Sequence, residues 1–154
     1  MRVILIISLL SITLLSVSCF ADKKAEVDSL TIDWHPRIES ALELAQQENK
    51  PVFVLFTGSD WCYWCMTLNK EVLTQQEFIK YAQENLFMVK LDFPKKIEQT
   101  EETIAYNNYK HSYYNIRGVP TVVLLSSSGD EIGRTGYQKG GALAYIQHLE
   151  SILP

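Results

Sequence analysis

The stretch GSDWCYWCM, residues 58–66, places two cysteines three residues apart among three large aromatic side chains. It follows residues 52–56, a continuous apolar run (VFVLF) that predicts a β-strand buried on both faces. Two thiols at this spacing can form a disulfide, bind a metal or attach a haem. The rest of the sequence has to distinguish among these chemistries.

The two cysteines are predicted to begin a helix that runs to residue 73, and they are not equivalent on it. Cys65 lies on a core-facing stripe with Leu68 and Val72, at i, i+3 and i+7. Cys62 lies in the first turn, where unpaired N–H groups stabilise negative charge. We therefore expect an exposed, readily ionised Cys62 as the nucleophile and a shielded Cys65 as the resolving thiol.

Other uses of the cysteine pair find less support. Covalent haem attachment needs a histidine directly after the second cysteine, where this chain has Met66. Structural zinc needs two further ligands, but His35, His111 and His148 are scattered and there is no second cysteine pair, so no metal site is expected. A purely structural disulfide across so short a loop would add little stability.

The N-terminus predicts a secretory signal peptide over residues 1–21, with a basic start, an apolar run and a cleavage site after Ala21. The apolar run is shorter than the roughly 20 residues that span a bilayer, although an uncleaved anchor is an alternative. Lipid attachment at Cys19 is less expected, because the leucine usual three places earlier is absent. Cleavage would leave Cys62 and Cys65 as the only thiols, which suits an oxidising compartment such as the periplasm.

After this segment we expect a polar lead-in over residues 22–29 and one domain over residues 30–154. The formal net charge is -4 and lysine and arginine are not clustered, so nucleic-acid binding is not expected. The sequence contains no dinucleotide-binding fingerprint, so no cofactor is predicted.

The sequence predicts alternating helices and strands along this domain. The expected helices cover residues 33–49 (capped by Asp33), 62–73, 76–81, 95–111 and 143–152. The expected strands cover residues 52–56, 86–93, 121–126 and 131–135. Helical connections predict parallel strands, and the turn at 127–130 predicts a final antiparallel hairpin. The expected fold is α/β, a central mixed β-sheet flanked by helices on both faces.

Three features together resemble the thioredoxin superfamily: the strand at 52–56, the DWCYWC motif after it, and IRGVPT at residues 116–121 before another strand. With the signal peptide, the chain is similar to exported bacterial thioredoxin-like disulfide reductases. The resemblance implies that Pro120 is a cis-proline lying against the cysteine pair, and that Val119 offers backbone hydrogen bonds to an extended substrate. Trp61 matches the family's tryptophan before the nucleophile.

The chain departs from the family in two places. Thioredoxins usually carry a buried acid six residues before the first cysteine, where this chain has Phe56. Asp60 or Glu71 could act as the proton acceptor instead, although each also fits an ordinary capping or surface carboxylate. The segment 92–118 is longer than in thioredoxin and contains four tyrosines, which fit either an amphipathic helix packed on the sheet or a partner-docking surface.

Tyr63 and Trp64 place no cation between the cysteines, and they would form an apolar lip for substrate beside Cys62. Because strong oxidants stabilise their reduced thiolate, this composition favours a disulfide reductase. An oxidase or isomerase is the alternative within the same chemistry; a non-catalytic chaperone or adaptor, or a metal carrier, is the alternative outside it. We expect a monomer whose partners are exported proteins with disulfides, and the resemblance implies a membrane thiol relay of the DsbD type as electron donor.

Overall fold

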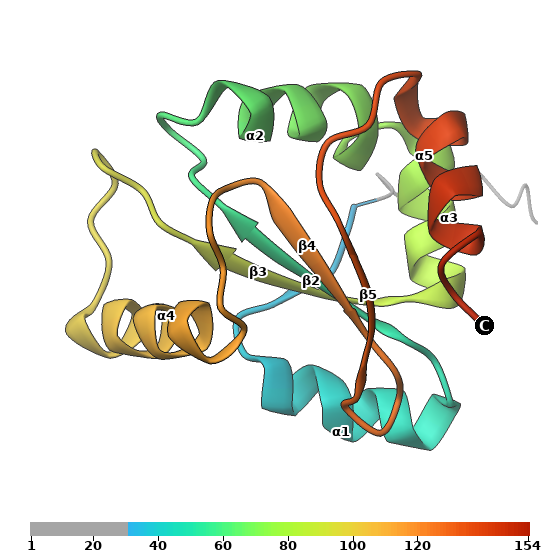
Figure 1. Ribbon diagram of the computed structural model, residues 1–154, viewed down its shortest axis with the longest axis horizontal. Coiled ribbons are helices and arrows are strands. Elements are labelled where there is room, and N and C mark those ends of the chain that lie inside the picture. The colour runs from blue at the N-terminus through green and yellow to red at the C-terminus, as the bar shows by residue number, and fades with distance from the viewer. Residues whose placement is uncertain (1–30) are drawn as a thin grey trace, which may run out of the picture.

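A five-stranded mixed sheet runs through the centre of the molecule (Figure 1). The computed structural model describes residues 31–154, so the expected signal peptide with Cys19 and the lead-in lie outside the described residues. The strands are β1 (Trp34–His35), β2 (Val52–Thr57), β3 (Phe87–Asp92), β4 (Thr121–Leu125) and β5 (Glu131–Thr135), in the order β1-β3-β2-β4-β5. The helices are α1 (Ile38–Glu48), α2 (Tyr63–Leu68), α3 (Gln76–Asn85), α4 (Glu101–Tyr113) and α5 (Gly141–Glu150), and a π-helical turn, η1 (Asn69–Leu73), continues α2.

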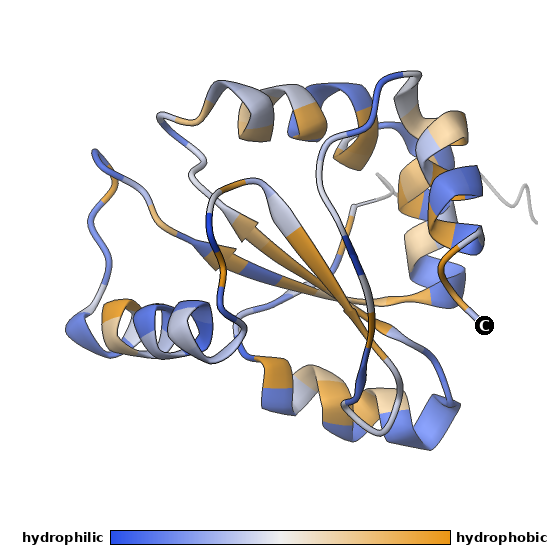
Figure 2. Cartoon of the chain, in the orientation of Figure 1, coloured by the Kyte–Doolittle hydropathy of each residue, from blue (hydrophilic) through white to orange (hydrophobic). Residues whose placement is uncertain are grey.

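The sheet has helices on both faces, as the sequence predicts. In Figure 1, α1 and α4 lie on one side of the sheet and α2, α3 and α5 on the other. All six residues of β2 are buried, and its side chains alternate between the two sides: Phe53 and Leu55 pack with α3 and α5, whereas Val54 and Phe56 pack with α1. Figure 2 shows β2 and β4 as the hydrophobic centre of the molecule.

One predicted strand direction is wrong. β2 and β3 are parallel, but β4 pairs antiparallel with β2, so that Thr121 lies opposite Phe56. The connection from β3 through α4 leaves the sheet at the end of β3 and re-enters it at that same end. Strand β4 therefore runs antiparallel to β2. This arrangement brings the start of β4 next to the end of β2, where the cysteines follow.

The expected helix at residues 33–49 begins later than predicted. Trp34 and His35 form the short strand β1, which pairs parallel with β3, and α1 starts at Ile38 with Arg37 at the N-cap position. Asp33 therefore does not cap the helix. Residues 95–100 likewise form a loop, and Thr100 caps α4 by accepting a hydrogen bond from the Thr103 N–H.

Within residues 31–154, no helix has both the length and the apolar character needed to cross a membrane.

Candidate active site

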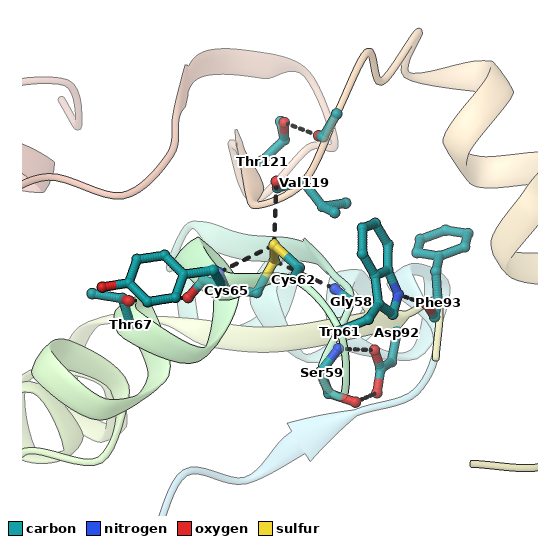
Figure 3. The surroundings of a disulfide bond; sticks show 12 residues. Gly58, Ser59, Trp61, Cys62, Cys65, Thr67, Asp92, Phe93, Val119 and Thr121 are labelled. Carbon is teal, nitrogen blue, oxygen red and sulfur yellow. Dashed lines mark hydrogen bonds between the residues drawn. A yellow bond between two sulfur atoms is a disulfide. The ribbon is translucent and has the colours of Figure 1, made fainter. Parts of the chain in front are cut away.

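The two cysteines lie where β2 gives way to α2, and they form a disulfide with a Cα–Cα distance of 5.2 Å (Figure 3). A tight turn closes this junction, because the Cys62 N–H donates to the Gly58 carbonyl oxygen at 2.9 Å. Cys62 occupies the N-cap position of α2, and its Sγ accepts a hydrogen bond from the Cys65 N–H at 3.2 Å. The sulfur of Cys62 is thus the group that faces the free N–H groups at the start of the helix.

Both cysteines are nearly buried in the disulfide, which differs from the predicted contrast between them. Cys62 is 7% exposed and Cys65 is 4% exposed. The sulfur of Cys62 lies 3.4 Å from the carbonyl oxygen of Val119, so the segment before β4 covers it (Figure 3). Helical periodicity in the sequence indicates only which side of its own helix Cys62 lies on. The segment that covers its sulfur lies more than fifty residues further along the chain.

The Val119–Pro120 peptide bond is cis, the geometry that the resemblance implies for Pro120. Next to it, the Thr121 hydroxyl donates to the Gly118 carbonyl oxygen at 2.7 Å, which closes the turn into β4. The segment therefore presents the Val119 backbone directly to Cys62.

Trp61 and Asp60 join the cysteine motif to the loop after β3. The Trp61 Nε1–H donates to the Phe93 carbonyl oxygen at 2.7 Å, and the Lys95 ammonium lies 4.3 Å from the centre of the indole ring. A Cβ atom at Gly58 would lie 2.5 Å from this ring, so a larger residue there would displace the indole. The ring is 41% exposed and forms one edge of the site.

The Asp60 carboxylate accepts hydrogen bonds from three successive backbone N–H groups, those of Lys95, Lys96 and Ile97. The hydrogen bond from the Lys95 N–H is the largest cause that lowers the pKa of Asp60 below its ordinary value, and the other two add to it. The carboxylate thus holds the 95–97 loop beside Trp61.

On the other side of the disulfide, Tyr63 and Trp64 are exposed, at 67% and 50%. Their rings meet edge-on with centroids 5.0 Å apart, and Trp64 also stacks on Tyr137, which lies after β5. The Tyr137 hydroxyl donates to the Glu71 carboxylate. The sequence patterns did not indicate Tyr137, although it is an aromatic residue in the glycine-rich loop at 136–141.

A cavity of about 240 Å³ lies behind Cys65. The residues of β2 on this side are Leu55 and Thr57, while Phe56, six positions before Cys62, packs on the opposite face of the sheet against Tyr114. Among the described residues, no carboxylate lines this cavity; its polar groups come from Thr57, Ser59, Asn69 and Lys90.

Comparison with known proteins agrees with this geometry. The model of the thioredoxin-like domain family matches residues 38–150. The chain is 34% identical over 144 residues to the disulfide bond reductase DsbH of Chlamydia pneumoniae, covering 88% of this chain and 86% of that protein. A solved structure of a DsbH oxidoreductase superposes with a TM-score of 0.77 at 33% identity, covering 86% of this chain and 92% of the other.

Two other relatives are longer than this chain. The thioredoxin-related protein DsbJ of Chlamydia pneumoniae is 34% identical over 155 residues, covering 96% of this chain and 44% of DsbJ. The thiol:disulfide interchange protein DsbD of Yersinia pestis is 25% identical over 123 residues, which cover 75% of this chain and 18% of DsbD. The chain therefore belongs to the thioredoxin-like family, as a thiol-disulfide oxidoreductase of the DsbH and DsbJ type with Cys62 and Cys65 as its cysteine pair.

Proposed function

We propose that this protein reduces disulfides of exported proteins in the periplasm, with Cys62 as the attacking and Cys65 as the resolving cysteine. The observation that carries the proposal is the position of Cys62: its sulfur accepts the Cys65 N–H at the start of α2 and lies 3.4 Å from the Val119 carbonyl oxygen. An extended substrate that pairs with the Val119 backbone would bring its own disulfide to this sulfur. A relative that is 34% identical is named a disulfide bond reductase, which supports the same direction.

The reaction conserves electrons through two exchanges. The Cys62 thiolate attacks one sulfur of the substrate disulfide, a mixed disulfide forms, and the other substrate sulfur leaves as a thiolate that takes up a proton. Cys65 then loses its proton and attacks the Cys62 sulfur, which releases the second substrate thiolate. The protein is left with the Cys62–Cys65 disulfide seen in the structure, and the substrate has gained two electrons.

The Cys62–Cys65 disulfide must accept two electrons before the next cycle, and we propose a membrane thiol relay of the DsbD type as their source. The two residues between the cysteines, Tyr63 and Trp64, carry no positive charge that would stabilise the Cys62 thiolate. A dithiol without such stabilisation gives up its electrons more readily, which favours reduction of the substrate over its oxidation. Trp61, Tyr63 and Trp64 would contact the substrate around its disulfide.

The roles of the two cysteines are tested by single substitutions with a model protein disulfide as substrate. Cys65→Ser should accumulate a mixed disulfide with the substrate, because the resolving thiol is gone, whereas Cys62→Ser should form none and lose reductase activity. Mass spectrometry of the trapped adduct identifies the attacking cysteine. A Cys62→Ser variant that still binds and protects unfolded substrate as well as the parent protein would favour a chaperone or adaptor.

The direction of electron flow is tested by the reduction potential of the Cys62–Cys65 pair, measured in glutathione and dithiothreitol buffers. We expect a value near that of thioredoxin, about -270 mV. A value near that of the strong oxidant DsbA, about -120 mV, would contradict the reductase proposal and make the protein a disulfide donor with the same cysteine roles.

A further inference from the structure

Tyr137 lies at the edge of the cysteine site, although 72 residues separate it in the chain from Cys65. Its ring stacks on that of Trp64, with centroids 5.3 Å apart and an angle of 25° between the planes. Its hydroxyl donates to the Glu71 carboxylate, and this hydrogen bond raises the pKa of Tyr137 above its ordinary value, so the phenol stays a neutral donor. Tyr137 is thus fixed at both ends, by a ring contact and by a hydrogen bond.

The loop that carries Tyr137 also backs onto the segment expected to bind substrate. A Cβ atom at the preceding residue, Gly136, would lie 3.0 Å from the Pro120 carbonyl oxygen. The same loop therefore contacts the cis-proline segment through Gly136 and the helix of the cysteines through Tyr137. A substrate chain running along Val119 would pass beside the stacked rings.

Trp64 is accessible from solvent, and the partly buried Tyr137, which also packs against the core, holds its ring in place. Trp64 is 50% exposed although Tyr137 covers one of its faces, and Tyr63 meets its edge at an angle of 77°. Exposed aromatic side chains with restricted orientation give a binding surface that loses little conformational entropy when it is occupied. The Glu71 carboxylate beside them already accepts a hydrogen bond from Tyr137.

We propose that Tyr137 and Trp64 form a substrate subsite that prefers an apolar or aromatic side chain next to the substrate cysteine. Flat aromatic rings gain most from contact with apolar and aromatic groups. Cysteines are among the most buried residues, so the neighbours of a cysteine in a misfolded protein are often apolar residues that belong in a core. The inference rests on the proposed function and adds to it the class of substrate segment that is preferred.

The subsite is tested with peptide disulfides that differ only in the residues flanking the cysteine: leucine or phenylalanine, serine, or lysine. Tyr137→Ala should lower kcat/KM for the apolar-flanked peptides by roughly three- to tenfold. It should leave the serine-flanked peptide, small-molecule disulfides and the reduction potential unchanged. Tyr137→Phe keeps the ring but loses the bond to Glu71, and we expect a smaller loss with the same selectivity.

Tyr109→Ala is the control for the loss of a tyrosine ring outside the cysteine site, because Tyr109 is 60% exposed and lies on α4. It should change none of these rates. An equal loss on all peptides, or no loss on the apolar ones, would overturn the subsite, and a parent preference for lysine-flanked peptides would show instead that the rings bind cations. Failure of the parent protein to reduce any disulfide would count against the proposed function. That outcome is distinct from the relative rates on the different peptides, which test the subsite.

Discussion

Asp60 holds the loop after β3 through hydrogen bonds to its backbone. Its carboxylate gathers the backbone N–H groups of residues 95–97, and Trp61, the next residue, is bonded to the carbonyl oxygen of Phe93. The residues just before Cys62 thus organise the entry to α4. The Asp60 carboxylate, one of the two candidate proton acceptors, is thus directed toward the 95–97 loop.

Asp60→Ala should release the 95–97 loop. We expect the backbone amides of residues 95–97 to exchange with solvent several-fold faster, because each loses its acceptor. Since the pKa of Asp60 is lowered below its ordinary value of 3.8, the parent loop should keep its protection below that pH and lose it as the carboxylate protonates. Hydrogen exchange, corrected for intrinsic rates, measures both effects.

Asp130→Ala is the control, because Asp130 accepts a hydrogen bond from Ser128 in the β4–β5 turn and has no contact with this loop. Unchanged exchange at residues 95–97 in Asp60→Ala would refute the role of Asp60.

At this scale, spacing in the sequence predicted the residues that are positioned locally, and the family resemblance supplied Val119 and Pro120, which approach Cys62 from a distant segment. The cysteine pair and its position at a helix start follow from spacing alone. Tyr137 could not be found in this way, because its place depends on a loop that packs against both Trp64 and Pro120. The orientation of Phe56 away from Cys65 is set by the register of β2 between its neighbours.

Among the helices, α4 and α5 each carry a tyrosine whose hydroxyl has a different environment. The Tyr106 hydroxyl, on α4, donates to Glu39 at 2.6 Å and accepts the Ile38 N–H at 2.8 Å, which ties α4 to the start of α1. The Tyr145 hydroxyl, on α5, is buried and has no hydrogen-bond partner among residues 31–154. The same atom type therefore stabilises one helix and carries a desolvation cost in the other.

Replacing each tyrosine with phenylalanine should have different effects on stability. Tyr106→Phe should lower the free energy of unfolding by about 1–2 kcal/mol, because the Ile38 N–H and Glu39 lose a partner. Tyr145→Phe should leave it unchanged or raise it by about 1 kcal/mol, because only an unpaired hydroxyl is removed. Urea unfolding of both variants gives the comparison, and a loss above about 1 kcal/mol for Tyr145→Phe would contradict the expectation.

The element order was largely predictable, and its errors have local physical causes. Strand β1 has only two residues, too few for a periodic pattern, and it exists because β3 offers it a hydrogen-bonding edge. The antiparallel direction of β4 depends on where α4 returns to the sheet, which periodicity does not report. The apolar runs of β2 and β4 were recognised because burial on both faces leaves a strong mark in the sequence.

Across the whole molecule, the two faces of the sheet are held by different kinds of contact. The face covered by α2, α3 and α5 is apolar, with Phe53, Phe78 and Tyr145 packed edge-on at its centre. The other face has an apolar cluster too, but α4 is fixed to it largely by polar groups. Lys110 and Asn107 of α4 are both buried, the former pairing with Glu39 and the latter donating to the Asp92 carbonyl oxygen.

This asymmetry predicts that acid loosens one face before the other. Burial raises the pKa of Glu39, but hydrogen bonds from Lys110 and Tyr106 outweigh it and leave the pKa below its ordinary value of 4.5. A carboxylate with a lowered pKa contributes its stability above that ordinary value and loses it as the pH falls through the pKa in the folded protein. The contacts of α4 should therefore weaken in this acidic range, while α3 and α5 stay packed.

Hydrogen exchange between pH 7 and pH 3, corrected for intrinsic rates, should show α4 losing protection at a higher pH than α3 and α5. Glu39→Gln tests the cause, because the amide cannot ionise and pairs only weakly with Lys110. In this variant we expect lower protection of α4 at neutral pH and little further change down to pH 4. Simultaneous loss of protection in all helices of the parent protein would mean that the two faces unfold as one unit, and that Glu39 does not set the acid response of α4.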